Sequence, residues 1–151
     1  MLEQKLVSDE TKPVAPAIAY VALGSNMGDR ARHLAEARAA LAALPDSRIL
    51  RESTVEETAP IGPIDQNSYF NQMVALETLL SPEALLDHLL RIEREHGRLR
   101  DVRWGPRTLD LDIVLFGDQR VTTDRLTVPH PELTRRDFWQ RELTELRGDG
   151  R

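Results

Sequence analysis

An arginine-rich stretch in the second half of the chain ends in two aspartates separated by one residue. Residues 98–112 read R-L-R-D-V-R-W-G-P-R-T-L-D-L-D, which places Asp110 and Asp112 two positions apart. Residues two apart on a β-strand point to the same face, so these carboxylates would project side by side, roughly 6 to 7 Å apart at Cα. Two carboxylates at that distance repel each other unless a cation lies between them. The spacing therefore predicts a cation site on a strand over residues 108–116.

The residue types indicate Mg²⁺ and a polyphosphate. Oxygen ligands favour Mg²⁺, which proteins usually hold through one or two carboxylates together with substrate phosphates. The planar fork of arginine matches phosphate oxygens. Four arginines precede the two aspartates: Arg98, Arg100, Arg103 and Arg107. Taken separately, an arginine-rich loop is commonly a solvated surface, and a D-x-D on a strand is commonly the polar face of a half-buried sheet. Together they favour chemistry on a polyphosphate, because the apolar residues that alternate with the aspartates would bury the strand and buried carboxylates need partners.

Composition narrows the class of protein. The chain has 151 residues, 40% hydrophobic and 30% charged, as expected for one globular domain. Its net charge of −5 argues against a nucleic-acid or anionic-membrane partner. The absence of cysteine excludes disulfides, zinc–thiolate sites and cysteine nucleophiles, and it suits a reducing compartment. No apolar run approaches membrane-spanning length, so we expect a cytoplasmic protein.

The hydrophobic pattern predicts the elements that must position the site. Strands are expected over residues 18–23, 48–58, 69–78 and 108–116, and helices over 30–44 and from Ser81 to Gly97. Asp29 or Asn26 would cap the first helix. A strand or hairpin arm over 119–126 and a helix over 132–146 would follow. This order predicts an α+β, ferredoxin-like βαββαβ sandwich: a mainly antiparallel sheet with helices packed on one face. Residues 1–17 are expected to form a flexible arm, 18–146 a single domain and 147–151 a frayed end.

Three further motifs have both a functional and an ordinary interpretation. His130 lies between two prolines and could contact a phosphate or a base, although His-Pro is also a common lead-in to a helix. Tyr69 and Asn71 begin a strand, where a polar group can reach a site or serve an ordinary hairpin. The G-S-N motif at residues 24–26 could bring backbone close to a ligand, but it is weak evidence alone.

Several sequence blocks occur in order along the chain: A-L-G-S-N at residues 22–26, T-A-P-I-G at 58–62, Y-F-N at 69–71, R-W-G-P-R-T-L-D-L-D at 103–112 and T-V-P-H at 127–130. Together they closely resemble the 6-hydroxymethyl-7,8-dihydropterin pyrophosphokinase family of folate synthesis. The ten-residue block is the specific one, and the resemblance runs from about residue 19 to residue 138.

The resemblance implies a ferredoxin-like fold and transfer of pyrophosphate from ATP to the pterin hydroxymethyl oxygen, with release of AMP. It implies that two Mg²⁺ ions are bound by Asp110 and Asp112, and that the catalytic residues are these two with Arg98 and Arg107. The implied ATP-binding residues are Arg98, Arg100, Arg107, Ile113, Arg125, Thr127 and His130. The implied pterin-binding residues are Thr58, Pro60, Tyr69, Asn71, Trp104 and Phe138. After Phe138 the sequence departs from the family pattern, so Trp139 is an alternative to Phe138 as the stacking ring.

Two other classes of protein fit parts of this pattern. Another two-magnesium enzyme acting on nucleotides, such as a phosphohydrolase, would use the same aspartates but would release pyrophosphate without an acceptor. An RNA-binding ferredoxin-like module would need exposed aromatic residues on its central strands, whereas aromatics are 5% of this chain. We expect a monomer with ATP and the hydroxymethyl-dihydropterin as its small-molecule partners.

Overall fold

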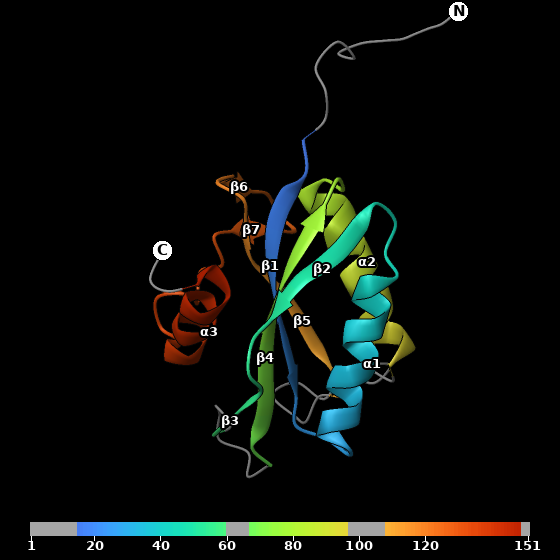
Figure 1. The fold of residues 1–151 in the computed structure, drawn as a ribbon, viewed down its shortest axis with the longest axis vertical. Coiled ribbons are helices and arrows are strands. Elements are labelled where there is room, and N and C mark those ends of the chain that lie inside the picture. Colours follow the sequence, from blue (N-terminus) through green and yellow to red (C-terminus); the bar gives the residue numbers. More distant parts are fainter. Residues whose placement is uncertain (1–14, 60–66, 97–107, 149–151) are drawn as a thin grey trace, which may run out of the picture.

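The computed structural model describes residues 15–59, 67–96 and 108–148, and its centre is a five-stranded antiparallel sheet (Figure 1). The strands are β1 (Ala17–Ser25), β2 (Ser47–Glu52), β3 (Glu56–Thr58), β4 (Tyr69–Thr78) and β5 (Asp110–Phe116). They follow the order β2-β4-β1-β5, and β3 pairs with the first residues of β4. Since β4 is antiparallel to both of its main neighbours, β1 and β2 run parallel with β4 between them. This is the split βαβ arrangement that the sequence predicts.

Helices of the described residues cover both faces of this sheet (Figure 1). Helices α1 (Arg30–Ala42) and α2 (Pro82–Glu95) pack on one face, and α3 (Asp137–Arg147) packs on the other. The prediction of helices on one face was therefore wrong for α3. Its apolar stripe is Trp139, Leu143 and Leu146, and these residues meet Ala22 and Met73 on the face that α1 and α2 leave open. None of the helices in the described ranges is long and apolar enough to cross a membrane.

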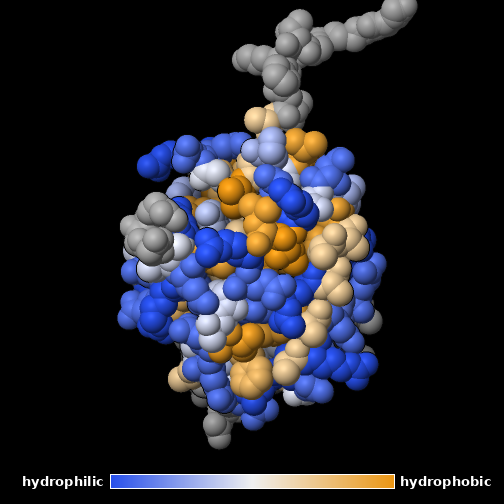
Figure 2. Space-filling view, viewed as in Figure 1, coloured by the Kyte–Doolittle hydropathy of each residue, from blue (hydrophilic) through white to orange (hydrophobic). Residues whose placement is uncertain are grey.

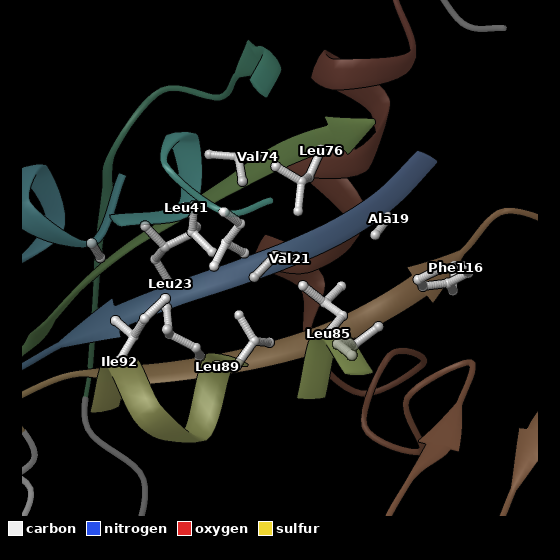
Figure 3. Close-up of a cluster of buried hydrophobic side chains, with 14 of the residues drawn as sticks. Ala19, Val21, Leu23, Leu41, Val74, Leu76, Leu85, Leu89, Ile92 and Phe116 are labelled. Carbon is white, nitrogen blue, oxygen red and sulfur yellow. The ribbon is translucent and has the colours of Figure 1, made fainter. Parts of the chain in front are cut away.

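The larger hydrophobic cluster lies between the sheet and helices α1 and α2 (Figure 3). Alternate residues of β1 contribute Ala19, Val21 and Leu23, all at most 1% exposed. The next residues along β1, including Ala22, face α3 instead, as the two-residue period of a strand requires. On β5 the extra residue Val114 has no partner on β1 and forms a β-bulge that joins the α3 cluster.

Side chains cap the first turns of helices α1 and α2, where local chemistry predicts. Asp29, one of the two proposed caps, accepts a hydrogen bond of 3.1 Å from the backbone N–H of Arg32 at the start of α1. Ser81 accepts one of 3.1 Å from Ala84 at the start of α2. Each bond satisfies a donor that the first helical turn leaves without a partner.

The predicted strand over 48–58 is two strands, β2 and β3, because Ser53 interrupts the backbone ladder. The Ser53 hydroxyl accepts from the backbone N–H of Met73 at 2.9 Å, in place of a backbone carbonyl. The Ser53 carbonyl instead accepts from the side chain of Gln72 at 2.6 Å. A serine that bonds the neighbouring backbone in this way competes with strand pairing.

The last third of the chain also differs from its prediction in detail. The expected arm over 119–126 is a small hairpin of β6 (Val121–Thr122) and β7 (Thr127–Val128). The expected helix over 132–146 begins only at Asp137. Arg136 has an extended backbone with φ −106° and ψ 95°, which breaks the helical path, and hydrogen-bonded turns precede it.

Candidate functional site

Asp110 and Asp112 project from the same face of β5, as their spacing predicts. Leu111 and Ile113 point to the opposite face, where they are 6% and 3% exposed within the larger cluster. The two aspartates are partly exposed and lie on the face that α3 covers in part. The carboxylate pair is therefore accessible from one side of the sheet only.

A glycine separates these acids from a second polar group on the same face. Gly24 of β1 lies directly between Asp110 of β5 and Asn71 of β4 in the strand register. A Cβ atom at Gly24 would lie 3.2 Å from Oδ1 of Asn71 and 3.5 Å from the ring of Tyr69. The missing side chain leaves a notch above Gly24, which Oδ1 of Asn71 and the Tyr69 ring border, between two strands whose backbones lie about 10 Å apart.

Three predicted residues meet on the far side of this notch. Asn71 is 7% exposed, and its Nδ2 donates to Oγ1 of Thr58 on β3 at 2.5 Å. Thr58 is paired with Tyr69 across the β3–β4 ladder, so all three lie on the same face. Because Nδ2 is used by Thr58, Oδ1 of Asn71 is the amide atom directed at the space above Gly24.

The start of β4 is held from the opposite face by Arg30 of α1. Its guanidinium donates to the carbonyl of Ser68 at 2.8 Å and lies 4.0 Å over the ring of Phe70. Glu57 of β3 joins this group, and the hydrogen bond from Ser68 and the charge of Arg30 lower the pKa of Glu57. These contacts fix the segment that carries Tyr69 and Asn71.

Hydrogen bonds with neighbouring backbone groups orient the His130 ring toward the acids. Its N–H donates to the carbonyl of Val114 at 3.0 Å, and its Nδ1 accepts from the N–H of Glu132 at 3.0 Å. The neutral ring therefore carries its proton on Nε2, which lies 3.6 Å from Oδ1 of Asp112. The indole of Trp139 packs edge-on against the imidazole at 4.9 Å. His130 and Asp112 are therefore neighbours in the structure.

The two candidate stacking rings have different surroundings. Trp139 is 2% exposed and belongs to the hydrophobic cluster beneath α3. Phe138 is only half-buried and packs against the edge of that cluster, 6.1 Å from the Trp139 ring. Trp139 is thus part of the core, and Phe138 is the ring with surface available to a ligand.

The other predicted ATP-binding residues in the described ranges lie near β5 or the small hairpin. Arg125 forms ion pairs with Asp87 and Glu83 of α2, and the hydrogen bond that it donates to Asp87 raises the pKa of Arg125. Thr127 is exposed on β7. The side chain of Ile113 is buried, so only its backbone is available for a contact.

The other predicted site residues, Arg98, Arg100, Arg107, Trp104 and Pro60, lie outside the described residues.

Two buried glutamates near the site were missed from the sequence. Glu93 of α2 is 5% exposed and accepts from the backbone N–H of Leu111 at 2.7 Å. This bond fixes β5 to α2 at the residue between Asp110 and Asp112. Glu142 of α3 is 2% exposed. The available signal was an acid within a helical apolar stripe: Glu93 follows Leu89 by four positions, and Glu142 follows Trp139 by three.

The donor set suits Mg²⁺ better than a cation that needs a closed protein cage. No group of three or more histidine, cysteine, aspartate or glutamate side chains gathers as a metal cage in the described ranges. Two partly exposed carboxylates on one strand match an ion that keeps waters and takes substrate oxygens as its other ligands. Asp110 and Asp112 are the residues that would hold it.

Comparison with known proteins identifies relatives along almost the whole of this fold. The model of the family described as 7,8-dihydro-6-hydroxymethylpterin-pyrophosphokinase (HPPK) matches residues 20–148. A Pseudomonas aeruginosa protein named 2-amino-4-hydroxy-6-hydroxymethyldihydropteridine pyrophosphokinase is 46% identical, over 86% of this chain and 80% of that protein. Proteins of the same name from Haemophilus influenzae and Bacillus subtilis are 44% and 45% identical, over 87% and 85% of this chain and 82% and 77% of theirs.

Proposed function

This chain belongs to the 7,8-dihydro-6-hydroxymethylpterin-pyrophosphokinase family, and we propose from that premise that it transfers pyrophosphate from ATP to 6-hydroxymethyl-7,8-dihydropterin. The products are AMP and the pterin diphosphate, an intermediate of tetrahydrofolate synthesis. The observation that carries the proposal is the row of Asp110, Gly24 and Asn71 on one sheet face. It puts a phosphate side and a heterocycle side within about 10 Å of each other.

The acids and His130 form the phosphate side. Asp110 and Asp112 bind Mg²⁺, which we propose to be two ions, and the metal when bound offsets the negative charge of the phosphates. Nε2 of His130, protonated in the neutral ring, donates to a phosphate oxygen close to Asp112. Arg125 and Thr127 contact the nucleotide from the hairpin, and the backbone of Ile113 contacts it from β5.

Asn71 and its neighbours form the acceptor side. The Asn71 amide offers an acceptor and a donor to the pterin edge, with its orientation fixed by Thr58. Tyr69 and Phe138 supply aromatic surface for the pterin ring, and Pro60 and Trp104 complete this pocket. The hydroxymethyl group then points across Gly24 toward the acids, so that the attacking oxygen lies in line with the ATP phosphates.

No covalent nucleophile is needed for this reaction. Transfer of a phosphoryl-type group depends on positioning and on neutralisation of charge. We propose that Arg98, Arg100 and Arg107 supply the positive charge that the transferred pyrophosphate requires and that Arg98 and Arg107 act in the transfer step. Exclusion of water from the site favours transfer to the pterin hydroxyl over hydrolysis.

We further propose that the protein is a monomer that acts in the cytoplasm without a nucleic-acid partner, and that residues 18–146 form its single domain.

Replacement of Asp112 tests the proposal. Asp112→Ala should reduce AMP formation at least a hundredfold while the far-ultraviolet spectrum is unchanged, because a transition-state charge contact is removed. Asp118→Ala is the matched control, since Asp118 is exposed in the turn after β5. Full turnover in Asp112→Ala would exclude the metal role. Release of free pyrophosphate without the pterin would instead indicate a phosphohydrolase.

A further inference from the structure

An unusual carboxyl lies buried between α3 and the sheet. Glu142 is 2% exposed, and no donor among the described residues reaches either of its carboxyl oxygens. A buried carboxylate without a donor is costly, so such a group keeps its proton instead. Burial, the largest cause, and the facing Glu56 carboxylate raise the pKa of Glu142 to about 8.

The groups that face Glu142 come from β3 and from α3 itself. Glu56 of β3 acts on it by charge and as a hydrogen-bond acceptor. Arg141 of α3 lowers the pKa of Glu142, and Glu145 of α3 raises it slightly. Arg141 also donates to Glu56, with its Nε 3.1 Å from Oε2, so Glu56 is bound to the residue of α3 that precedes Glu142.

Glu56 connects this contact to the site. It lies directly opposite Asn71 in the β3–β4 ladder, and β3 is only three residues long. Two residues later, Thr58 accepts the hydrogen bond from Nδ2 of Asn71. The position of β3 against α3 therefore determines the orientation of the Asn71 amide.

We propose that Glu142 is a positioning residue for the heterocycle side of the site, acting as a neutral acid that donates its proton to the Glu56 carboxylate. This inference rests on the proposed function, because Asn71 is taken as the residue that reads the pterin. When Glu142 loses its proton, its buried carboxylate faces the partly exposed carboxylate of Glu56 and the two repel. Strand β3 then moves away from α3, and Thr58 no longer fixes Asn71.

The test compares the wild type with Glu142→Gln between pH 6.5 and 9.5. The glutamine side chain has a similar shape and always carries a donor for Glu56. The KM for the pterin in the wild type should rise roughly three- to tenfold above pH 8, with the KM for ATP unchanged, whereas Glu142→Gln should show no such rise. The ratio of the two pterin KM values cancels any titration of the substrate itself.

Glu145→Gln is the matched control on the same helix. Glu145 anchors α3 by accepting from the backbone and hydroxyl of Thr54 at 3.1 and 2.9 Å, whereas the hydrogen bond from α3 to Glu56 comes from Arg141. This variant should keep the rise of the wild-type pterin KM above pH 8. A rise abolished equally by Glu145→Gln would show general loosening of α3 and would overturn the inference.

A second measurement does not depend on turnover. The side-chain carboxyl carbon of Glu142, followed by nuclear magnetic resonance in the full chain, should titrate near pH 8, and a midpoint near 4.5 would overturn the inference. Active enzymes with parallel pterin profiles would also overturn it and leave the proposed function standing. No transfer at any pH by a folded wild-type protein would overturn the proposed function, and the role of Glu142 with it.

Discussion

Single side chains define the candidate site by their shape as much as by their charge. Gly24 illustrates this, since it separates the acids from Asn71 without occupying the space between them. Its backbone is not in the left-handed region, so the need for glycine here is steric and does not come from the backbone conformation. His130 likewise depends on a neighbouring N–H that selects its tautomer.

Gly24→Ala should therefore raise the KM for the pterin roughly tenfold and leave the KM for ATP close to that of the wild type. The new methyl group would lie 3.2 Å from Oδ1 of Asn71 and would displace the amide. Steady-state kinetics with each substrate varied in turn measure both constants. An unchanged pterin KM would mean that the notch above Gly24 is not where the pterin lies.

Substitution can separate the functions of the two ring nitrogens of His130. His130→Asn keeps a side-chain acceptor for the N–H of Glu132, as in an Asx-turn, but removes the Nε2 donor near Asp112. We expect it to weaken Mg-ATP binding roughly tenfold at nearly wild-type stability. His130→Ala, which loses both functions, should also lower the free energy of unfolding by about 1 kcal/mol. Calorimetric titration and urea unfolding measure these effects, and equal Mg-ATP affinity in His130→Asn would exclude the phosphate contact.

At the scale of elements, the site depends on how edges of the sheet are held. Strand β5 is at the edge of the sheet, and two of its backbone groups bond outside it: the N–H of Leu111 donates to Glu93 of α2, and the carbonyl of Val114 accepts from the N–H of His130. Strand β3 is held by β4 on one side and by Arg141 of α3 above it. Each carboxylate or amide of the site therefore lies on a strand that a helix fixes through a polar contact.

Glu93→Leu tests this dependence for β5. The substitution leaves the buried N–H of Leu111 without its acceptor, which should lower the free energy of unfolding by about 1 to 3 kcal/mol. Glu93→Gln keeps an acceptor and should lose less. Mg-ATP affinity should fall in the same order, because Asp110 and Asp112 flank Leu111. Glu95→Gln, an exposed partner of Arg91 on the same helix, is the control. Equal stability of Glu93→Leu and Glu95→Gln would contradict this account.

At the scale of the whole molecule, the surface is mostly hydrophilic, with hydrophobic atoms in small groups, on the face that Figure 2 shows. The two clusters on opposite faces of the sheet supply the interior, and the buried Glu142 lies on α3, the helix that gives Trp139 and Leu143 to the smaller of them. A single titrating group in that interior couples the stability of the fold to pH.

The sign of this coupling follows from the raised pKa of Glu142. Between pH 4.5 and about 8 the unfolded chain carries the carboxylate while the folded chain carries the acid, so folding takes up a proton. The free energy of unfolding therefore falls as pH rises through this window and is level above it. Relative to Glu142→Gln, the wild type should lose on the order of 3 kcal/mol between pH 4 and pH 7.5. Urea unfolding of both proteins measures the difference, and parallel curves would contradict it.

Rules that depend only on neighbouring residues were sufficient to predict part of the fold and of the candidate site. The shared face of Asp110 and Asp112, the caps at Asp29 and Ser81, and the order of the main elements follow from the period of a strand and from helix-end chemistry, which depend on neighbours in sequence. The family blocks also identified Thr58, Tyr69 and Asn71 before any geometry was known. The structure brings these three together on one face with the acids.

Packing between distant segments accounts for the rest. The place of Gly24 between Asp110 and Asn71 depends on the pairing of three strands whose residues are far apart in the chain. Helix α3 packs on the sheet face opposite α1 and α2, and Trp139 and Glu142 of α3 are buried. The hydrophobic pattern of a helix does not specify which face of the sheet the helix will cover. Registers and partners arise from the free energy of the whole packed sheet, so they appear only once the chain is folded.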